Sequence, residues 1–430
     1  MRLLIRNAYV IPVAGSDFTG DVAVEDGRIV FAGPTGAVPG TFEADEIIDA
    51  TGMVATPGLV NCHTHAAMTL FRGYADDLPL MEWLTRKIWP VENLLTGDDI
   101  YWGSLLAGLE MLKSGTTTFA DQYFEMDRVA QAVEEIGLRA SLCRGLIGVS
   151  EHAEKALAEG CEFVRRWHGA AAGRISAMLG PHAPYTCPPA YLKKVVAASE
   201  ELDVGLHIHL SETRTEIEQI KAEYGCSPIA LMEEIGLFHR PVLAAHCVHL
   251  SEVEIEILAR RGVGVAHNPQ SNMKLASGIA PVVRMLAAGV RVGIGTDGAA
   301  SNNDLNMVEE MRTAALLQKV AQGDPTVLPA GLVLEMATAG GARVLGLEDR
   351  IGTLEVGKRA DVVLWRVNQP HLCPAHNYQA HLVYSAGRAD VDTVIVDGHV
   401  VMRGRRVLTV DEETVLRQAE RTARRLIESV

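Results

Sequence analysis

The chain is 430 residues long, with 48% hydrophobic and 22% charged residues. This composition is that of a globular protein with a sizeable buried core, and the length allows a large barrel together with a smaller module. The formal net charge of −15 argues against nucleic acid and against an anionic membrane surface as partners, because both interactions require clustered Lys and Arg.

Cysteine usage and apolar segments indicate the compartment. The seven cysteines are scattered and form no Cys-x-x-Cys pair, which is typical of reduced thiols and not of a disulfide framework. The N-terminal segment MRLLIRNAYVIPV has no signal-peptide cleavage pattern. No uninterrupted apolar run reaches the roughly 18 residues that a membrane helix needs. We therefore expect a soluble protein of the cytoplasm.

Strand-like and helix-like segments alternate through most of the chain. Residues 1–56 contain short strands separated by Gly and Pro turns. Residues 57–349 contain eight strand candidates, each followed by a helix or a long loop, which predicts an α/β fold with a (β/α)8 barrel of the TIM type. Short strands return over residues 350–410, and we expect them to join the first segment in a small β-sandwich that flanks the barrel. Residues 411–430 are predicted to form an amphipathic surface helix.

Histidine pairs occur on two of the predicted barrel strands. His63 and His65 in GLVNCHTH are two residues apart, so both imidazoles of a strand would point to one face, toward the barrel mouth. Neutral imidazoles suit a borderline metal such as Zn²⁺. The spacing recurs in VGLHIHL, where His209 lies nearer the C-terminal end of the strand, at which barrel active sites form. We therefore predict His209 as a third ligand and interpret His207 as a hydrogen-bonded histidine one layer deeper.

An aspartate completes the predicted site. Asp297 ends the apolar run VRVGIGTD, where a buried carboxylate is costly unless it is paired or binds a metal. We therefore expect one divalent metal per subunit, taken as Zn²⁺, held by His63, His65, His209 and Asp297. This ligand set leaves a coordination position open for water, as a catalytic site requires. His246 ends the strand VLAAHC and is expected to polarise the attacking hydroxide without binding the metal.

The chain resembles the amidohydrolase superfamily over nearly its whole length. The resemblance rests on GLVNCHTH, on HLSE at His209, on the strand ends at His246 and Asp297, and on GTLEVGKRADVVLW. It implies a mononuclear site, because the end of the fourth strand, RISAMLGPHAPYTC, offers no lysine for a two-metal centre. The runs HAAMTLFRGYADDLPLMEWL, HNPQSNMKLASGIAPV and GTDGAASNNDLNM are similar to those of superfamily deaminases that act on 5′-thioether adenosines.

This resemblance implies a reaction and a role for each candidate residue. Hydrolysis would replace the C6 amino group of adenine in 5′-methylthioadenosine, S-adenosylhomocysteine or adenosine, with release of ammonia. Asp297 would take a proton from the attacking water and pass one to the leaving amine, and Glu212 would protonate N1 of the ring. His246 would stabilise the tetrahedral intermediate. Glu92 would accept hydrogen bonds from both ribose hydroxyls, and His182 would contact the purine or the ribose.

Several alternatives stay open at the level of the sequence. Relatives of this branch act on guanine, oxidised purines or chlorinated triazines, and some barrel relatives serve as non-catalytic assembly subunits. The resemblance also suggests a homodimer or homotetramer. The apolar residues of the segment after the first strand would form either a lid over the 5′ group or a helix packed on the barrel; they are Met81, Trp83, Leu84 and Ile88. Three residues receive no role, namely Arg144, His249 and His267.

Overall fold

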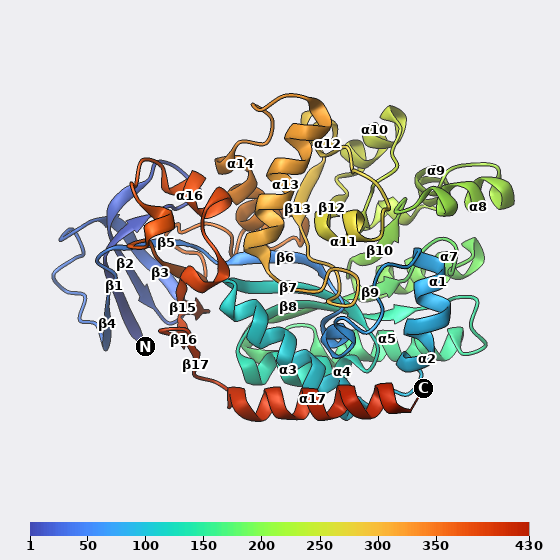
Figure 1. Ribbon diagram of the computed structural model, residues 1–430, viewed down its shortest axis with the longest axis horizontal. Helices are drawn as coiled ribbons and strands as arrows, with labels where there is room; N and C mark the ends of the chain where they lie inside the picture. Colours follow the sequence, from blue (N-terminus) through green and yellow to red (C-terminus); the bar gives the residue numbers. More distant parts are fainter. Residues whose placement is uncertain (430) are drawn as a thin grey trace.

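The computed structural model describes residues 1–429, and a barrel of parallel strands forms its centre (Figure 1). Eight strands follow one another in chain order around this sheet, each parallel to its neighbour. They are β6 (Leu59–Thr64), β7 (Thr116–Tyr123), β8 (Arg139–Leu146), β9 (Ile175–Pro181), β10 (Leu206–Leu210), β11 (Val242–His246), β12 (Gly264–His267) and β13 (Arg291–Ile294).

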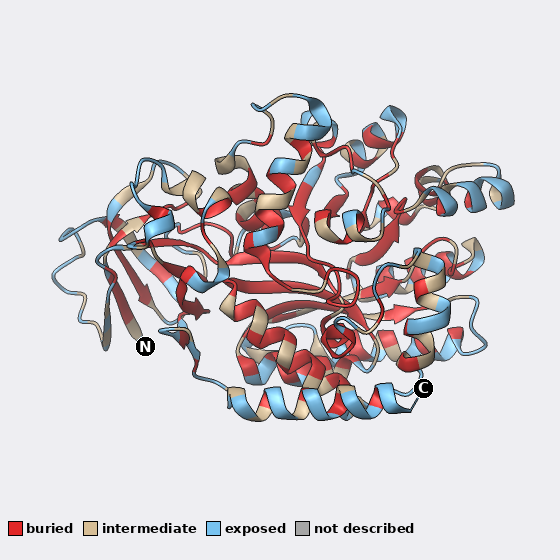
Figure 2. Ribbon diagram, in the orientation of Figure 1, coloured by how far each residue is buried: buried red, intermediate tan, exposed pale blue. Residues whose placement is uncertain are grey.

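Helices cover the outer face of the barrel. Every residue of β6, β7, β10, β11 and β12 is buried, as expected for parallel strands covered on both faces. Figure 2 shows this buried centre and the exposed outer sides of the surrounding helices. The principal helices are α3 (Gly97–Lys113), α4 (Met126–Ile136), α5 (Ala153–Trp167), α7 (Pro189–Leu202), α8 (Arg214–Tyr224), α10 (Glu252–Arg261) and α13 (Met307–Gln322). The shorter helices are α1 (Leu80–Trp83), α2 (Trp89–Glu92), α6 (Ala170–Gly173), α9 (Pro228–Glu234), α11 (Pro269–Lys274), α12 (Val282–Ala287), α14 (Ala330–Glu335), α15 (Gly341–Val344) and α16 (Tyr378–Tyr384).

Side-chain hydrogen bonds join the first strand of the barrel to the segment after the last one. The amide of Asn61 on β6 donates to Oγ1 of Thr296 at 2.8 Å, and its Oδ1 accepts from the Thr296 backbone N–H at 3.0 Å. The backbone N–H of Asp297 donates to the carbonyl of His63 at 2.9 Å. Closure of the barrel therefore brings two of the predicted metal ligands together.

Both ends of the chain build the flanking module. Its nine strands form one connected sheet in which β5 from the N-terminal part pairs antiparallel with β14 from the C-terminal part. They are β1 (Arg2–Val10), β2 (Phe18–Glu25), β3 (Arg28–Pro34), β4 (Glu46–Asp49), β5 (Met53–Pro57), β14 (Val362–Arg366), β15 (Val391–Val396), β16 (His399–Arg403) and β17 (Arg406–Val407). The sheet has its own apolar core, which includes Leu3, Ile5, Val22 and Leu364. The predicted fold class was an α/β barrel of the TIM type with a small flanking β-sandwich built from both chain ends. It is confirmed, with the flanking strands joined in one sheet separate from the barrel.

A buried ion-pair cluster connects the module to the barrel. Arg139 begins β8, and its guanidinium contacts both carboxylate oxygens of Asp361, at 2.9 and 3.1 Å. A third contact of 3.2 Å reaches Asp397. These three contacts fix the orientation of the module relative to the barrel. Removal of one partner would leave an uncompensated buried charge.

The C-terminal helix α17 (Glu412–Glu428) lies along α3 (Figure 1). Asp411 caps its first turn through a bond from the Thr414 backbone N–H at 3.2 Å. Its buried side chains recur at helical spacing and include Val415, Ala419 and Leu426, so one face packs on the protein. Among residues 1–429, no helix has both the length and the apolar character needed to cross a membrane.

Candidate metal centre and active site

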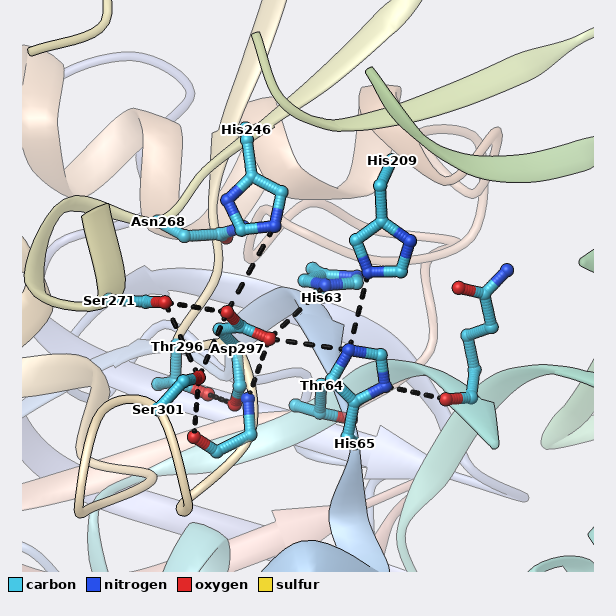
Figure 3. A network of polar contacts seen from close by, with 12 residues as sticks. His63, Thr64, His65, His209, His246, Asn268, Ser271, Thr296, Asp297 and Ser301 are labelled. Atoms are coloured by element: carbon cyan, nitrogen blue, oxygen red, sulfur yellow. Dashed lines mark hydrogen bonds and ion pairs between the residues drawn. The ribbon is translucent and has the colours of Figure 1, made fainter. Parts of the chain in front are cut away.

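Four histidines and one aspartate converge at the mouth of the barrel (Figure 3). Nε2 of His65 lies 3.3 Å from Nε2 of His209, which comes from β10 on the other side of the barrel. Oδ1 of Asp297 lies 3.4 Å from Nε2 of both His63 and His65. His246 ends β11 with its Nε2 4.0 Å from Oδ2 of Asp297. Strand ends far apart in the sequence thus present their polar atoms to one point.

The chemistry of these side chains fits a divalent cation. The ligand atoms of His63, His65 and Asp297 lie within 4.8 Å of one another, and so do those of His63, His209 and His246. Nε2 of His63 is buried and has no hydrogen-bond partner among residues 1–429, although a buried nitrogen is normally satisfied. Imidazole nitrogens with one carboxylate oxygen are the ligands of catalytic zinc sites. The predicted ligands are all present here, with His246 as a fifth group beside them.

Burial keeps the rings of His63 and His209 neutral, which is the state that binds metal. It lowers the pKa of His63 to about 4 and that of His209 well below its ordinary value. The neighbouring imidazoles lower the pKa of His209 further.

Backbone carbonyls orient two of the rings. Nδ1 of His65 lies 2.6 Å from the carbonyl of Gln122, and Nδ1 of His209 lies 2.7 Å from the carbonyl of His182. A carbonyl only accepts, so each Nδ1 must carry the hydrogen. A neutral ring with its hydrogen on Nδ1 has its lone pair on Nε2, and in both residues Nε2 faces the cluster. Such orienting bonds are typical of metal-binding histidines.

A deeper histidine supports His63. Nδ1 of His63 lies 2.8 Å from Nε2 of His207, which is fully buried. The other ring nitrogen of His207 lies 3.6 Å from the thiol of Cys143. The sequence-based interpretation of His207 as a hydrogen-bonded residue behind the cluster agrees with this position.

Two serines hold the carboxylate of Asp297. Ser271 on α11 and Ser301 both donate to Oδ2, at 2.6 and 3.0 Å. Burial opposes the negative charge, but His63 and the neighbouring imidazoles outweigh it, so the pKa of Asp297 lies well below its ordinary value. Asp297 is therefore an anion whose second oxygen is anchored.

Glu212 and His246 lie side by side over the cluster. Nε2 of His246 is 3.8 Å from Oε2 of Glu212, and Nδ1 of His246 is 2.9 Å from Oδ1 of Asn272. Burial raises the pKa of Glu212. Burial also opposes protonation of His246, but the carboxylates of Glu212 and Asp297 outweigh it and raise the pKa of His246. The pKa of Glu212 is thus raised while that of Asp297 is lowered, and such opposite shifts are typical of acid–base pairs in enzymes.

A cavity of about 560 Å³ lies above these residues, within the range of small-molecule sites. Glu92 on α2 and His182, directly after β9, both line it. The hydroxyl of Tyr123 donates to Oε1 of Glu92 at 2.6 Å. Burial raises the pKa of Glu92 and lowers that of His182 to about 4. The cavity wall also contains His65, His209, Glu212, His246 and Asp297.

The segment after β6 contributes to this wall. Trp83, Leu84 and Ile88 line the cavity, whereas Met81 is not a wall residue and is 44% exposed. Trp83 also donates from its indole nitrogen to the carbonyl of Ala75 at 3.0 Å. The segment therefore covers the site and packs on the barrel at once.

The three residues without a predicted role lie outside the wall. Arg144 pairs with Glu159 at 2.8 Å, and Nε2 of His249 lies 2.8 Å from the carbonyl of Ser277. His267 is fully buried, and burial lowers its pKa to about 3.

Sequence reasoning missed several polar residues around the cluster. Ser271 and Asn272 are adjacent on α11, and they contact Asp297 and His246 respectively. They lie within the run HNPQSNMKLASGIAPV, but serine and asparagine are common at helix starts, so the letters alone carry no signal. A second case is Asp121, which accepts from the Thr64 hydroxyl and the Ala66 backbone N–H and holds the turn after the histidine pair.

The model of the amidohydrolase family matches residues 54–401. The chain belongs to the amidohydrolase family. Its predicted superfamily and enzyme class are thereby confirmed. A 5-methylthioadenosine/S-adenosylhomocysteine deaminase of Desulforudis audaxviator (strain MP104C) is 99% identical over 430 residues, which cover 100% of both chains.

Two solved structures share the fold of this chain. An adenosine deaminase from Xanthomonas campestris with bound zinc has a TM-score of 0.96 and 39% identity, covering 100% of this chain and 99% of that one. Atrazine chlorohydrolase from Arthrobacter aurescens TC1, complexed with zinc, has a TM-score of 0.91 and 26% identity, covering 98% and 100%. The chain is thus more similar in sequence to the nucleoside deaminase than to the triazine enzyme.

Proposed function

We propose that the protein is a zinc-dependent deaminase that converts 5′-methylthioadenosine, S-adenosylhomocysteine or adenosine to the inosine analogue and ammonia. The observation that carries the proposal is that one cavity wall contains groups for all three tasks: the metal-binding cluster, Glu212 for the ring, and Glu92 for the ribose. The names of the 99% identical relative and of the zinc-containing adenosine deaminase support the same substrate class.

His63, His65, His209 and Asp297 would hold the metal. The orphaned Nε2 of His63 and the Nε2 atoms that carbonyls direct into the centre support this set. Bound there, a divalent cation supplies Lewis-acid activation of water.

Asp297 and Glu212 would divide the proton transfers. Asp297 takes a proton from the attacking water and returns one to the leaving amino group. Glu212 would deliver a proton to N1 of the purine, which makes C6 more electrophilic, and its raised pKa supports this role. The opposite pKa shifts of the two carboxyl groups support this division.

His246 and His182 would contact the reacting base. His246, whose Nε2 lies 4.0 Å from Oδ2 of the anionic Asp297, would donate a hydrogen bond to the oxygen that adds to C6, where negative charge develops. His182 is neutral and lies on the cavity wall, where it contacts the purine or the ribose.

Glu92 would select a nucleoside over a free base. A carboxylate accepts from two vicinal hydroxyls at once, and guanine and triazines offer no such pair. This is the feature that separates the proposal from the alternative of a guanine, oxidised-purine or triazine hydrolase.

The test is a substrate screen of the zinc-loaded protein, followed by loss of the adenine absorbance and by released ammonia. We expect turnover of adenine nucleosides and none of guanine or atrazine. Turnover confined to guanine or a triazine would contradict the proposal, and no turnover of any of them would favour a non-catalytic subunit.

We also propose a cytoplasmic homo-oligomer, a dimer or a tetramer. All seven cysteines are unpaired, which supports a reducing compartment. Sedimentation of the purified protein tests the oligomeric state.

A further inference from the structure

A buried acid that the proposed reaction does not use lies behind the metal centre. Glu310 is in the first turn of α13 and is fully buried. Burial raises the pKa of Glu310 well above its ordinary value, and the nearby carboxylates of Asp304 and Asp297 raise it as well. Both effects favour the neutral acid, whose carbonyl oxygen and hydroxyl have the shape of a glutamine amide. A buried polar group of this kind normally has hydrogen-bond partners.

Two hydrogen bonds to Glu310 come from separate segments of the barrel mouth. Oε1 accepts from the side-chain amide of Asn302, and Oε2 accepts from the backbone N–H of Gln270 at 3.4 Å. Gln270 directly precedes Ser271, and Asn302 directly follows Ser301. These are the two serines that donate to Oδ2 of the proposed base (Figure 3). One carboxyl group thus joins the two segments that hold the base.

The amide of Asn302 also reaches the backbone beside Asp297. Besides its bond to Glu310, Nδ2 of Asn302 donates to the carbonyl of Thr296 at 2.7 Å. Thr296 directly precedes Asp297, whose φ of 65° lies in the left-handed region. Residues with a side chain adopt this region at a cost, so the surrounding contacts must hold the backbone there. Asn302 supplies one such contact, and Glu310 fixes the position of its amide.

We infer that Glu310 is a positioning residue, which sets the places of the two serines and thereby the orientation of the Asp297 carboxylate. The inference rests on the proposed function, in which Asp297 moves protons between water and the leaving amino group. Within residues 1–429, Glu310 neither lines the cavity nor belongs to the metal-binding groups. Its loss should therefore slow the proton transfers without weakening nucleoside binding.

The experiment compares Glu310→Ala with Glu310→Gln in the zinc-loaded protein. We expect Glu310→Ala to lower kcat for 5′-methylthioadenosine by about tenfold or more, because small misplacements of a catalytic group are costly. Its KM should stay within about twofold of the wild type, since binding contacts are kept. Glu310→Gln keeps the shape and the acceptor for Asn302, so its kcat should stay within about threefold of the wild type.

Two results of this comparison would overturn the inference. One is a kcat of Glu310→Gln as low as that of Glu310→Ala, which would mean that the hydrogen bonds are not what matters. The other is loss of zinc from Glu310→Ala in elemental analysis, which would make Glu310 a residue for metal retention.

Gln318 provides a matched control on the same helix. It is also fully buried, lies about two turns further along α13, and donates from Nε2 to the carbonyl of Ala280 at 2.9 Å. Gln318→Ala thus removes a buried side chain of similar size and should lower Tm while leaving kcat unchanged. A fall of kcat equal to that of Glu310→Ala would assign the effect to the stability of the helix and overturn the inference.

A double-mutant cycle tests whether Glu310 acts through the serines. If it does, Ser271→Ala combined with Glu310→Ala should lower kcat by clearly less than the product of the two single losses, about a hundredfold. Losses that multiply would show that the two residues act independently, and would overturn the inference. Failure of the wild-type protein to deaminate any adenine nucleoside would instead contradict the proposed function, and it is measured without any substitution.

Discussion

Ser271 on α11 donates a hydrogen bond of 2.6 Å to Oδ2 of Asp297, which follows strand β13. Ser301 donates to the same oxygen at 3.0 Å. The other oxygen, Oδ1, faces His63 and His65. The two bonds to Oδ2 thus fix the orientation of the Asp297 carboxylate, and Oδ1 faces the metal-binding cluster.

Loss of the Ser271 hydroxyl should reduce turnover. A hydrogen bond to a charged group contributes about 1.5–3 kcal/mol, so we expect Ser271→Ala to lower kcat by about tenfold or more. Steady-state kinetics with metal analysis of the same sample measure this. The matched variant Ser301→Ala, which removes the longer bond, should lose less; loss of metal in Ser271→Ala would show a role in metal retention instead.

Replacement of His246 by Gln should separate catalysis from metal binding. We expect kcat to fall by about a hundredfold, the usual effect of removing one charge-stabilising donor, while metal content stays close to one per subunit. Elemental analysis beside the kinetic assay checks both values. Because the ring nitrogen of His246 lies with those of His63 and His209, a metal-free His246→Gln protein would make His246 a ligand.

Replacement of Glu92 by Gln should weaken nucleoside binding. The variant keeps one acceptor but loses the charge that receives two ribose hydroxyls, so KM for 5′-methylthioadenosine should rise about tenfold or more. The 2′,3′-dideoxy nucleoside is the matched probe, since its KM should be nearly the same in both proteins. An unchanged KM for the ribonucleoside would show that residues other than Glu92 recognise the ribose.

Removal of the metal should lower the melting temperature. A ligand that binds only the native state stabilises it by about 4 kcal/mol when its free concentration is a thousand times Kd. We expect chelation to lower Tm measured by calorimetry and Zn²⁺ to restore it. Mg²⁺ should not restore it, because that cation prefers oxygen ligands; recovery with Mg²⁺ would argue against the histidine-rich ligand set.

Stability should fall as the pH rises through the range set by Asp304. Burial, together with the carboxylates of Glu309 and Glu110 and against a bond from the Asn306 backbone N–H, raises the pKa of Asp304 from 3.8 to about 7. The folded protein therefore keeps a proton that the unfolded chain releases near pH 4. The contribution of Asp304 to the free energy of unfolding is fully present below pH 4 and is lost as the pH rises to about 7.

The variant Asp304→Asn should remove this dependence. Its amide oxygen can keep the bond from the Asn306 N–H, which Oδ1 of Asp304 accepts at 3.1 Å. We expect its Tm to exceed that of the wild type by about 1–3 °C at pH 8 and to match it near pH 4. A lower Tm of the variant at pH 8 would mean that Asp304 is stabilising as an anion.

The sequence by itself determined the features that depend on local pattern. Alternation of strands and helices predicted the parallel barrel, and position at the C-terminal ends of strands picked out His63, His65, His209 and Asp297. The structure brings these four side chains together because strand periodicity decides which side chains share a face, and barrel closure brings all strand ends to one mouth.

Only the tertiary structure decided the partners that hold those residues in place. Ser271 reaches Asp297, Asn272 reaches His246, and Arg139 joins the barrel to Asp361 of the flanking module. Such contacts depend on loop conformation and strand register over long sequence separations, and no periodicity in the chain records them.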